Sequence, residues 1–297
     1  MTTTTTQNPA QFKTLGERSI GAILIDTGKL SPIDAERILR SQKENNLRFG
    51  DAAQQLGLLT ESDIQFALAH QFNYPYLGRN DKSISDEVVA AFNPFSTVVE
   101  QMRALRTQLK LRWFDADASH KSLAVVSLAS KEGRSFIAAN LAVVFSQLGE
   151  NTLLIDADMR KPRQHQLFNI SNSTTGLSSV LAERTSPKDA VFRVQKLLGL
   201  SVLPAGATPP NPQELLSRDV FSAMLKEYGQ SYDVIIVDTP AASESADVQT
   251  ISSRVGAALL VASNNSTRLI ELENLAVNLQ NFNVDIVGSV LNNIRPE

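Results

Sequence analysis

The last two thirds of this 297-residue chain alternate short apolar runs with stretches of helical periodicity, and no other feature limits the possible folds as strongly. The apolar runs are SLAVVSL (122–128), NTLLIDAD (151–158), LSVLPAG (200–206), YDVIIVDTP (232–240), GAALLVAS (256–263) and DIVGSVLNN (285–293). Apolar strands that alternate with helices predict an α/β fold, in which helices cover both faces of a parallel sheet. Ligands of such sheets bind beyond the carboxyl ends of the strands.

The N-terminal part of the chain contains an internal repeat. SIGAILIDTGKLSPIDAERILRSQ aligns with RFGDAAQQLGLLTESDIQFALAHQ at a constant offset of 29 residues. Each copy predicts a helix, a glycine that ends it, and a second helix whose N-cap is Ser31 or Thr60. We expect four parts: a disordered polar tail over 1–15, a small helical repeat domain over 16–78, a linker with one short helix over 79–96, and the α/β domain over 97–297.

Composition excludes several classes of protein. A net charge of −3 argues against general nucleic-acid binding, so we expect no nucleic-acid partner. There are no cysteines, which excludes disulfides and thiolate metal sites, and the three scattered histidines argue against zinc. The N-terminus lacks the pattern of a secretory signal, and no apolar run approaches the ~18 residues that span a bilayer. We expect a cytoplasmic protein that reaches a membrane through a partner.

The segment ASKEGRSF (129–136) stands where a phosphate-binding loop belongs, between an apolar run and a helical pattern. The usual pattern is G-x-x-x-x-G-K-[ST]. Gly133 and Ser135 fit it, whereas Leu128 replaces the first glycine and Arg134 replaces the lysine. Taken alone, this segment keeps too little of the pattern to establish a nucleotide site.

Further polar residues follow three other strand-like runs on the same predicted edge. They are Asp156 and Asp158 in LLIDADMRKP, Asp238 in VIIVDTPA, and Asn292 in VLNN. Carboxylates beside a serine at a helix N-terminus form a plausible Mg²⁺ pocket, because Mg²⁺ takes a few oxygen ligands and completes its shell with water and phosphate. Each aspartate alone could equally be a cap or a turn residue. Their order and spacing together favour the nucleotide site.

At this point the sequence resembles the bacterial tyrosine kinases, which are grouped with P-loop ATPases of the MinD and ParA type. Five segments carry the likeness over about residues 97–294: EQMRALRTQL (100–109), LLIDADMRKP (153–162), HQLFNISNSTTGLSSVL (165–181), LPAGATPPNPQELL (203–216) and VIIVDTPA (234–241). The resemblance is greatest to the EpsG type, a chain-length determinant tyrosine kinase of exopolysaccharide biosynthesis. It implies a P-loop NTPase-like fold, ATP and Mg²⁺ as cofactors, and protein-tyrosine kinase activity.

The resemblance also implies roles for individual residues. Asp156 would be the general base that accepts the tyrosine proton, and Asp158 would act beside it. Asp158, Asp238 and Ser135 would organise Mg²⁺, while Gly133 would let backbone N–H groups close on the phosphates. The expected nucleotide-binding residues are Lys131, Glu132, Gly133, Arg134, Ser135, Phe136 and Asn292, with the last of these near the adenine.

Arg134 is the main departure from the family pattern, and it would act in catalysis in place of the lysine. Its guanidinium keeps the positive charge but is planar and wide, so it suits bidentate phosphate contact better than a point contact inside a tight loop. Nucleotide binding could then survive while turnover falls. Phe136 replaces a hydroxyl residue, and Lys131 stands where the family more often has glycine. Both Arg134 and Phe136 are typical of the EpsG type.

Glu100, Arg103 and Arg106 match the E-x-x-R-x-x-R oligomerisation motif of the family at helical spacing. The resemblance implies a homo-oligomer formed through this helix, and the plainer interpretation is a solvated face with an internal ion pair. The family's C-terminal tyrosine cluster is missing here. Tyr74 and Tyr76 are candidate substrates, although packing as aromatic anchors is the simpler hypothesis for them.

The N-terminal repeat resembles the N-terminal domain of type II secretion ATPases, some of which bind cyclic di-GMP through paired R-[LI]-G segments. The second copy keeps Arg48, but Ser19 stands at that position in the first copy. This favours a docking or dimerisation role over cyclic di-GMP binding. The resemblance also implies a chain-length determinant inner-membrane protein as activator. Two other functions stay open: a nucleotide-binding pseudokinase scaffold, and a positioning ATPase, which is disfavoured because Ala129 replaces its extra lysine.

Overall fold

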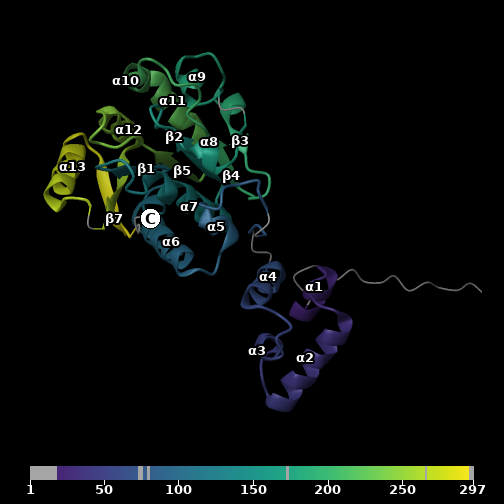
Figure 1. Ribbon diagram of the computed structural model, residues 1–297. Coiled ribbons are helices and arrows are strands. Elements are labelled where there is room, and N and C mark those ends of the chain that lie inside the picture. The colour runs from purple at the N-terminus through teal and green to yellow at the C-terminus, as the bar shows by residue number, and fades with distance from the viewer. Residues whose placement is uncertain (1–18, 73–75, 79–80, 172–173, 265, 294–297) are drawn as a thin grey trace, which may run out of the picture. The chain divides into compact units, whose positions relative to one another are not determined.

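The computed structural model describes residues 19–72, 76–78, 81–171, 174–264 and 266–293 (Figure 1). The chain divides into two compact units, Met1–Pro75 and Tyr76–Glu297. The tail expected over 1–15 lies outside the described residues.

The first unit contains four helices: α1 (Ile20–Asp26), α2 (Pro32–Asn45), α3 (Phe49–Gln55) and α4 (Glu61–Gln71). They form two helix pairs, as the repeat predicts. Gly28 and Gly57 follow the first helix of each pair with φ of 70° and 66°, a backbone conformation that suits glycine. The side chains of Ser31 and Thr60 accept hydrogen bonds at the starts of α2 and α4, which confirms them as N-caps. The buried core includes Leu24 and Ile38.

The second unit is built on a seven-stranded sheet of order β3-β4-β2-β5-β1-β6-β7. The strands are β1 (Ser122–Ser127), β2 (Thr152–Asp156), β3 (Phe192–Arg193), β4 (Leu200–Leu203), β5 (Val234–Asp238), β6 (Ala257–Ser263) and β7 (Asp285–Asn292). All pairs are parallel except β3 with β4. The six predicted strands are therefore confirmed, and only the two-residue edge strand β3 was not expected.

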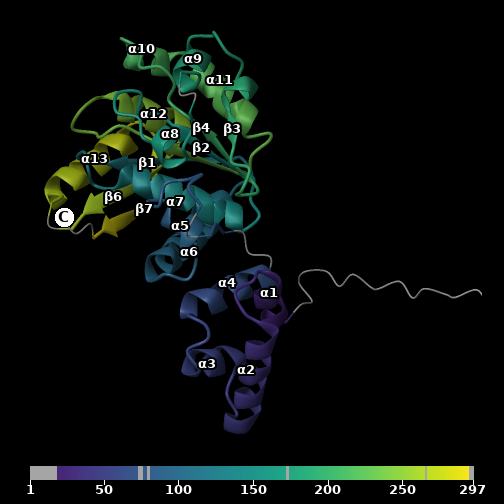
Figure 2. The same cartoon turned by 45° about the vertical axis from the view of Figure 1, so that its right-hand side comes forward.

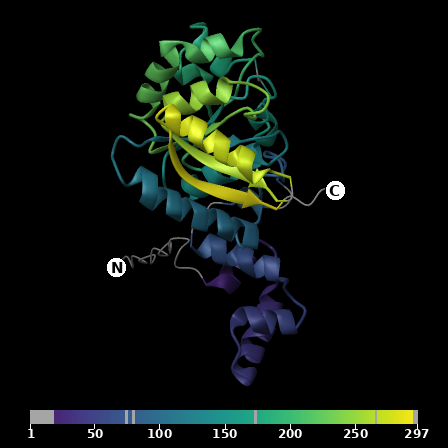
Figure 3. The same ribbon diagram turned by 90° about the vertical axis from the view of Figure 1, so that its left-hand side faces the viewer.

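Helices cover both faces of this sheet. They are α5 (Val89–Phe92), α6 (Thr97–Leu109) with a π-helical turn η2 (Lys110–Phe114), α7 (Arg134–Gln147), α8 (Gln164–Leu167), α9 (Leu177–Leu181), the 3₁₀ turn η3 (Lys188–Ala190), α10 (Pro212–Ser217), α11 (Asp219–Tyr228), α12 (Asp247–Val255) and α13 (Leu269–Asn281). Figures 1 and 2 show α5, α6 and α7 on one side of the sheet and α10, α11 and α12 on the other. In Figure 3 the yellow helix α13 runs beside the yellow strand β7.

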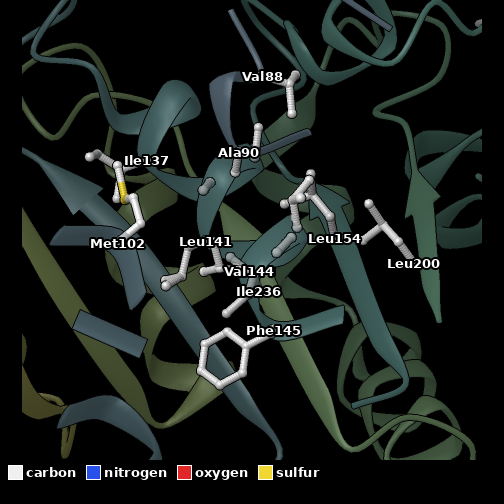
Figure 4. Close-up of a cluster of buried hydrophobic side chains, with 14 of the residues drawn as sticks. Val88, Ala90, Met102, Ile137, Leu141, Val144, Phe145, Leu154, Leu200 and Ile236 are labelled. Atoms are coloured by element: carbon white, nitrogen blue, oxygen red, sulfur yellow. The ribbon is translucent and has the colours of Figure 1, made fainter. Parts of the chain in front are cut away.

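Alternation along the strands separates two buried cores. On β1, Leu123 and Val125 pack with α5, α6 and α7, whereas Ala124 and Val126 pack with the helices of the other face. Figure 4 shows part of the first core, including Leu141 and Phe145 of α7 with Ile236 of β5. Because α7 is buried almost all round, it holds the loop before it in a fixed position over the sheet edge.

The segment 79–96 differs from the expected linker. Its short helix is present, but Val88 and Ala90 are fully buried in the core beside α7. The side chain of Asn140 on α7 accepts a hydrogen bond from the Ala90 backbone at 2.9 Å and donates one to the Glu87 carbonyl at 3.1 Å. This segment is therefore part of the α/β unit. Among the described residues, no helix is both long enough and apolar enough to cross a membrane.

Candidate active site

The loop between β1 and α7 stands where the sequence predicts a phosphate-binding loop, and two of its residues have positive φ. Lys131 and Gly133 both have left-handed conformations, with φ of 66° and 87°, and Gly133 is the N-cap of α7. The left-handed conformation is costly at Lys131, which is not a glycine. Backbone N–H groups in such turns, next to a helix N-terminus, form a concavity that favours an anion.

Arg134 does not extend to the solvent. Its side chain is only 9% exposed, and its Nη1 donates a hydrogen bond of 2.7 Å to Oγ of Ser127 at the end of β1. Its Nη2 contacts Asp158 Oδ2 at 3.3 Å, and its Nε lies 3.3 Å from Asp238 Oδ1. The Nε contact is an ion pair without hydrogen-bond geometry, because neither atom has a hydrogen-bond partner. Arg134 therefore bridges two of the predicted magnesium ligands.

Three predicted carboxylates meet at this edge of the sheet. Asp156 and Asp238 end β2 and β5 in register beside each other, and both are fully buried. Asp158 follows in the next loop and is 4% exposed. Backbone N–H groups donate hydrogen bonds to Asp156 and Asp158. Those of Arg163 and Gln164 donate to Asp156 at 3.0 and 2.9 Å, and that of Lys161 donates to Asp158 at 2.9 Å.

The surroundings raise the pKa of two of these groups. Burial and the neighbouring charge of Asp238 raise the pKa of Asp156 well above its ordinary value, against the lowering effect of its backbone hydrogen bonds. Burial also raises the pKa of Asp158, although the Arg134 guanidinium acts in the opposite direction. A raised pKa makes a carboxylate a stronger proton acceptor as long as the group stays ionised, which is the property a general base needs.

Gln164 is a site residue that the sequence did not indicate. Its fully buried amide Nε2 donates to Asp238 Oδ2 at 2.8 Å and to the carbonyl of Ser135 at 3.1 Å. With its backbone bond to Asp156, Gln164 touches the phosphate loop helix and two strand-end aspartates. No local pattern marks it, because its partners are 8, 29 and 74 residues away along the chain.

Two more predicted residues lie together beside the loop. Glu132 is buried, and its carboxylate accepts a hydrogen bond of 2.8 Å from the backbone N–H of Ala129 and another from the hydroxyl of Thr267. Asn292, near the end of β7, donates to the Glu132 carbonyl at 3.0 Å. These bonds tie the loop to the segment after β6 and to the last residue of β7.

The remaining residues of the loop face different surroundings. Lys131 is exposed and Ser135 is partly buried in the first turn of α7, while Phe136 packs against the core beneath that helix. Phe136 therefore contributes packing. Gln164 links the backbone carbonyl of Ser135 to the carboxylate of Asp238.

The carboxylates at this edge of the sheet offer oxygen ligands for a divalent cation, but Arg134 occupies part of the same space. Asp238 Oδ1 is a buried acceptor without a hydrogen-bond partner, as a metal ligand would be. The predicted set of Ser135, Asp158 and Asp238 supplies two carboxylates and a hydroxyl, a chemistry that suits Mg²⁺. Across the described ranges, however, no three acidic or histidine side chains converge as a ready metal site, and Arg134 contacts both carboxylates.

The predicted oligomerisation residues make contacts inside their own chain. Arg103 forms an ion pair of 2.8 Å with Glu100, as the plainer interpretation expects, and also bonds the Pro94 carbonyl. Arg106 donates to the carbonyl of Val144 on α7 at 2.8 Å. Glu100 is the exposed member, with 71% of its side chain accessible.

The tyrosines differ in accessibility. Tyr228 is buried, donates its hydroxyl to the Pro187 carbonyl at 2.7 Å, and has a pKa raised by burial. It lies edge-on to Tyr232. Tyr76 is partly buried, and Tyr74 lies outside the described residues. Tyr228 is therefore unsuited to be a phosphate acceptor in this fold.

The sheet order and the loop before α7 define an α/β protein of the P-loop NTPase class. The cell division ATPase MinD of Pyrococcus furiosus shares the fold at a TM-score of 0.51 and 24% identity, covering 58% of this chain and 71% of MinD. The chimerical protein CapA2B2 is more similar, with a TM-score of 0.65 and 31% identity over 80% of this chain and 100% of the chimera.

Comparison of the sequence with known proteins identifies the family within the P-loop NTPase class. The family model of cellulose biosynthesis protein BcsQ matches residues 120–284. The tyrosine-protein kinase YwqD of Bacillus subtilis is 37% identical over 205 residues, which are 69% of this chain and 85% of YwqD. The tyrosine-protein kinase in the cps region of Klebsiella pneumoniae is 36% identical over 80% of this chain, but the matched part is only 31% of that relative's length. The chain belongs to the bacterial tyrosine kinase family, as its aspartate motifs predicted.

Proposed function

We propose that this protein is an ATP-dependent protein-tyrosine kinase that regulates the chain length or export of an exopolysaccharide, as the EpsG type does. The observation that carries the proposal is the position of the buried Asp156, Asp158 and Asp238 at one edge of the sheet, where Arg134 of the predicted phosphate loop contacts two of them. Family membership supports the reaction, and the cps region named for the Klebsiella pneumoniae relative supports the polysaccharide context.

In this proposal the tyrosine hydroxyl oxygen bonds to the γ-phosphorus of ATP while the bond from that phosphorus to the bridging oxygen breaks and ADP leaves. Asp156 takes the hydroxyl proton, and its raised pKa suits that role. The N–H groups around Gly133 hold phosphate oxygens at the start of α7. Ser135, Asp158 and Asp238 hold Mg²⁺, which neutralises phosphate charge when bound. Lys131, exposed beside the loop, supplies a further positive charge toward the nucleotide. Asn292 keeps the loop closed through Glu132.

The proposed partner is a chain-length determinant protein of the inner membrane, with this chain held at the membrane by that protein. The resemblance of the chain to the EpsG type, which implies such an activator, supports this partner. Glu100 is exposed and available for contact with a neighbouring subunit, so a homo-oligomer through α6 is part of the proposal.

The deciding experiment is a phosphotyrosine assay with Mg²⁺ and ATP, run with and without the membrane partner. Wild-type protein is expected to form phosphotyrosine, and the Asp156→Asn variant is expected to form none. An Arg134→Lys variant in the same assay asks whether the family's usual lysine raises the rate. Absence of phosphotyrosine from wild-type protein in both settings would remove the catalytic claim.

A second function is favoured by one observation, the engagement of Arg134 with Asp158 and Asp238. A protein that kept this arrangement would be a nucleotide-binding pseudokinase scaffold of the same assembly. Calorimetry distinguishes the two, since a scaffold binds ADP or ATP without turnover. A chain that binds no nucleotide would exclude both functions.

A further inference from the structure

The Arg134 guanidinium is the counter-ion of the buried carboxylate pocket. In the described part of the chain it is the one basic side chain that forms an ion pair with Asp158 or Asp238. Neighbouring cations are paired outside the pocket: Arg160 with Asp247, Lys161 with Glu244, and Arg163 with Glu87. Buried charges require such compensation, so Arg134 stabilises the aspartates in this state.

The contact to Asp238 is incomplete. Nε of Arg134 and Oδ1 of Asp238 are buried and 3.3 Å apart, yet neither makes a hydrogen bond. The Nη1 group is instead directed to Ser127, which holds the side chain in the pocket. An ion pair with this geometry is weaker than a bidentate one, so a better cation can replace it.

A divalent cation would use the same carboxylate oxygens. Mg²⁺ binds oxygen ligands at about 2.0–2.1 Å and accepts little departure from octahedral geometry. It cannot occupy the space between two carboxylates while a guanidinium contacts both. Arg134 begins in the first turn of α7, beside the loop, and a guanidinium suits bidentate contact with phosphate.

We propose that Arg134 and a divalent cation are alternative occupants of one carboxylate pocket, and that arrival of the metal with its nucleotide moves Arg134 from the aspartates to the phosphates. This inference rests on the proposed function for the identity of the metal and nucleotide. It makes Arg134 a gate on metal binding in addition to a phosphate ligand. The nucleotide-free protein then stays folded without metal.

The test uses the full chain without nucleotide, so that it does not depend on kinase activity. Thermal unfolding is measured for wild-type protein and Arg134→Ala at constant ionic strength, with and without MgCl₂. Removing the counter-ion is expected to lower Tm by roughly 6 °C or more, and Mg²⁺ is expected to restore most of that loss. Mg²⁺ should leave the wild-type Tm nearly unchanged.

Arg254→Ala is the matched control, because Arg254 also loses hydrogen bonds, to Ser217 and Ser222, but faces no buried aspartate cluster. Its Tm should not respond to Mg²⁺. Mn²⁺ titration followed by electron paramagnetic resonance gives the second measurement. Arg134→Ala is expected to bind Mn²⁺ at least tenfold more tightly than wild-type protein.

The proposed exchange would be wrong if wild-type protein and Arg134→Ala bound Mn²⁺ with equal affinity, or if Mg²⁺ stabilised both equally. Should Arg134→Ala fail to fold, Arg134→Lys carries the test, since a single ammonium cannot reproduce the three contacts of the guanidinium. Its Mn²⁺ affinity should rise at least threefold, and an unchanged affinity would again overturn the proposal. A kinase-inactive protein that shows this exchange would refute the proposed function alone.

Discussion

The carboxylates of the two units contribute to the molecule in opposite ways. In the helical unit, Asp63 completes a capping box at the start of α4 and pairs with Lys29 at 2.6 Å. Although partial burial alone would raise it, the hydrogen bonds from Lys29 and Thr60 lower the pKa of Asp63 to about 2. In the α/β unit, burial raises the pKa of Asp156. The ionised form of Asp63 therefore stabilises the helical unit, whereas the ionised form of Asp156 destabilises the α/β unit.

This difference sets opposite dependences on pH. The folded pKa of Asp63 lies below its unfolded value of about 3.9, so its contribution is present above pH 4 and is lost as pH falls through about 2. The folded pKa of Asp156 lies above the unfolded value, so its ionisation begins to cost stability as pH rises above about 4. A buried carboxyl group with a raised pKa costs stability when it ionises, which agrees with the catalytic role proposed for Asp156.

The largest effect is expected for Asp156→Asn. Loss of the general base should reduce phosphotyrosine formation at least about 100-fold. The change in Tm at pH 7 should be small, because removal of a buried carboxyl group with a raised pKa offsets the loss of one side of its backbone hydrogen bonds. Kinetic assays and calorimetry on the same preparation measure both. A large fall in Tm would show that Asp156 is a structural group like Asp63, and the contrast between the units would fail.

The second prediction concerns Gln164, which holds the aspartates relative to the loop. Gln164→Leu removes the bonds to Asp238 and Ser135 and should cost about 1–3 kcal/mol of stability. It should also lower kcat by about tenfold to 100-fold with a smaller change in KM, since positioning rather than binding is lost. Gln166→Leu, on the exposed side of α8, is the control. Equal effects of both substitutions would assign Gln164 to helix stability alone.

Much of the fold and site could be predicted from local sequence, and the exceptions share a cause. VIIVD is a short run rich in β-branched residues, which predicts a buried strand that ends at Asp238, and β5 confirms this strand. The edge strand β3 was not predictable, because two residues carry no period and its pairing with β4 depends on the rest of the fold. Gln164 was missed for the same reason, since an amide gains its role only from distant partners.

The segment 79–96 and Arg134 illustrate two further limits of prediction from the sequence. The apolar residues of 88–92 suggest a helix, but their burial depends on Asn140, 50 residues from Ala90. At Arg134 the sequence establishes a positive charge at the phosphate loop. It does not establish whether the guanidinium faces phosphates or Asp158 and Asp238, because both are acceptors of the same kind.

A smaller effect is expected in the helical unit. Asp63→Ala removes the capping box and the Lys29 ion pair, and should cost roughly 1 kcal/mol at pH 7, since the pair is partly exposed. Amide hydrogen exchange in α4 measures this, and most of the difference should disappear near pH 2. Asp51→Ala, an acidic residue in the first turn of α3, is the control. A loss that persisted unchanged at pH 2 would show that the charge of Asp63 is not what stabilises α4.

The smallest effect on stability is expected for Glu100→Ala. Glu100 is a carboxylate of the α/β unit that neither caps a helix, as Asp63 does, nor is buried, as Asp156 is. Glu100 is exposed and pairs only at i,i+3 with Arg103, so its removal should change stability by less than about 0.5 kcal/mol. If α6 joins subunits, the same variant should shift the sedimentation profile toward monomer, because the partner would lose an accessible acidic contact. Glu271→Ala, which breaks another surface i,i+3 pair, with Arg268 just before α13, should leave the profile unchanged. Identical profiles for wild type and Glu100→Ala would limit Glu100 to the surface ion pair seen within its own chain.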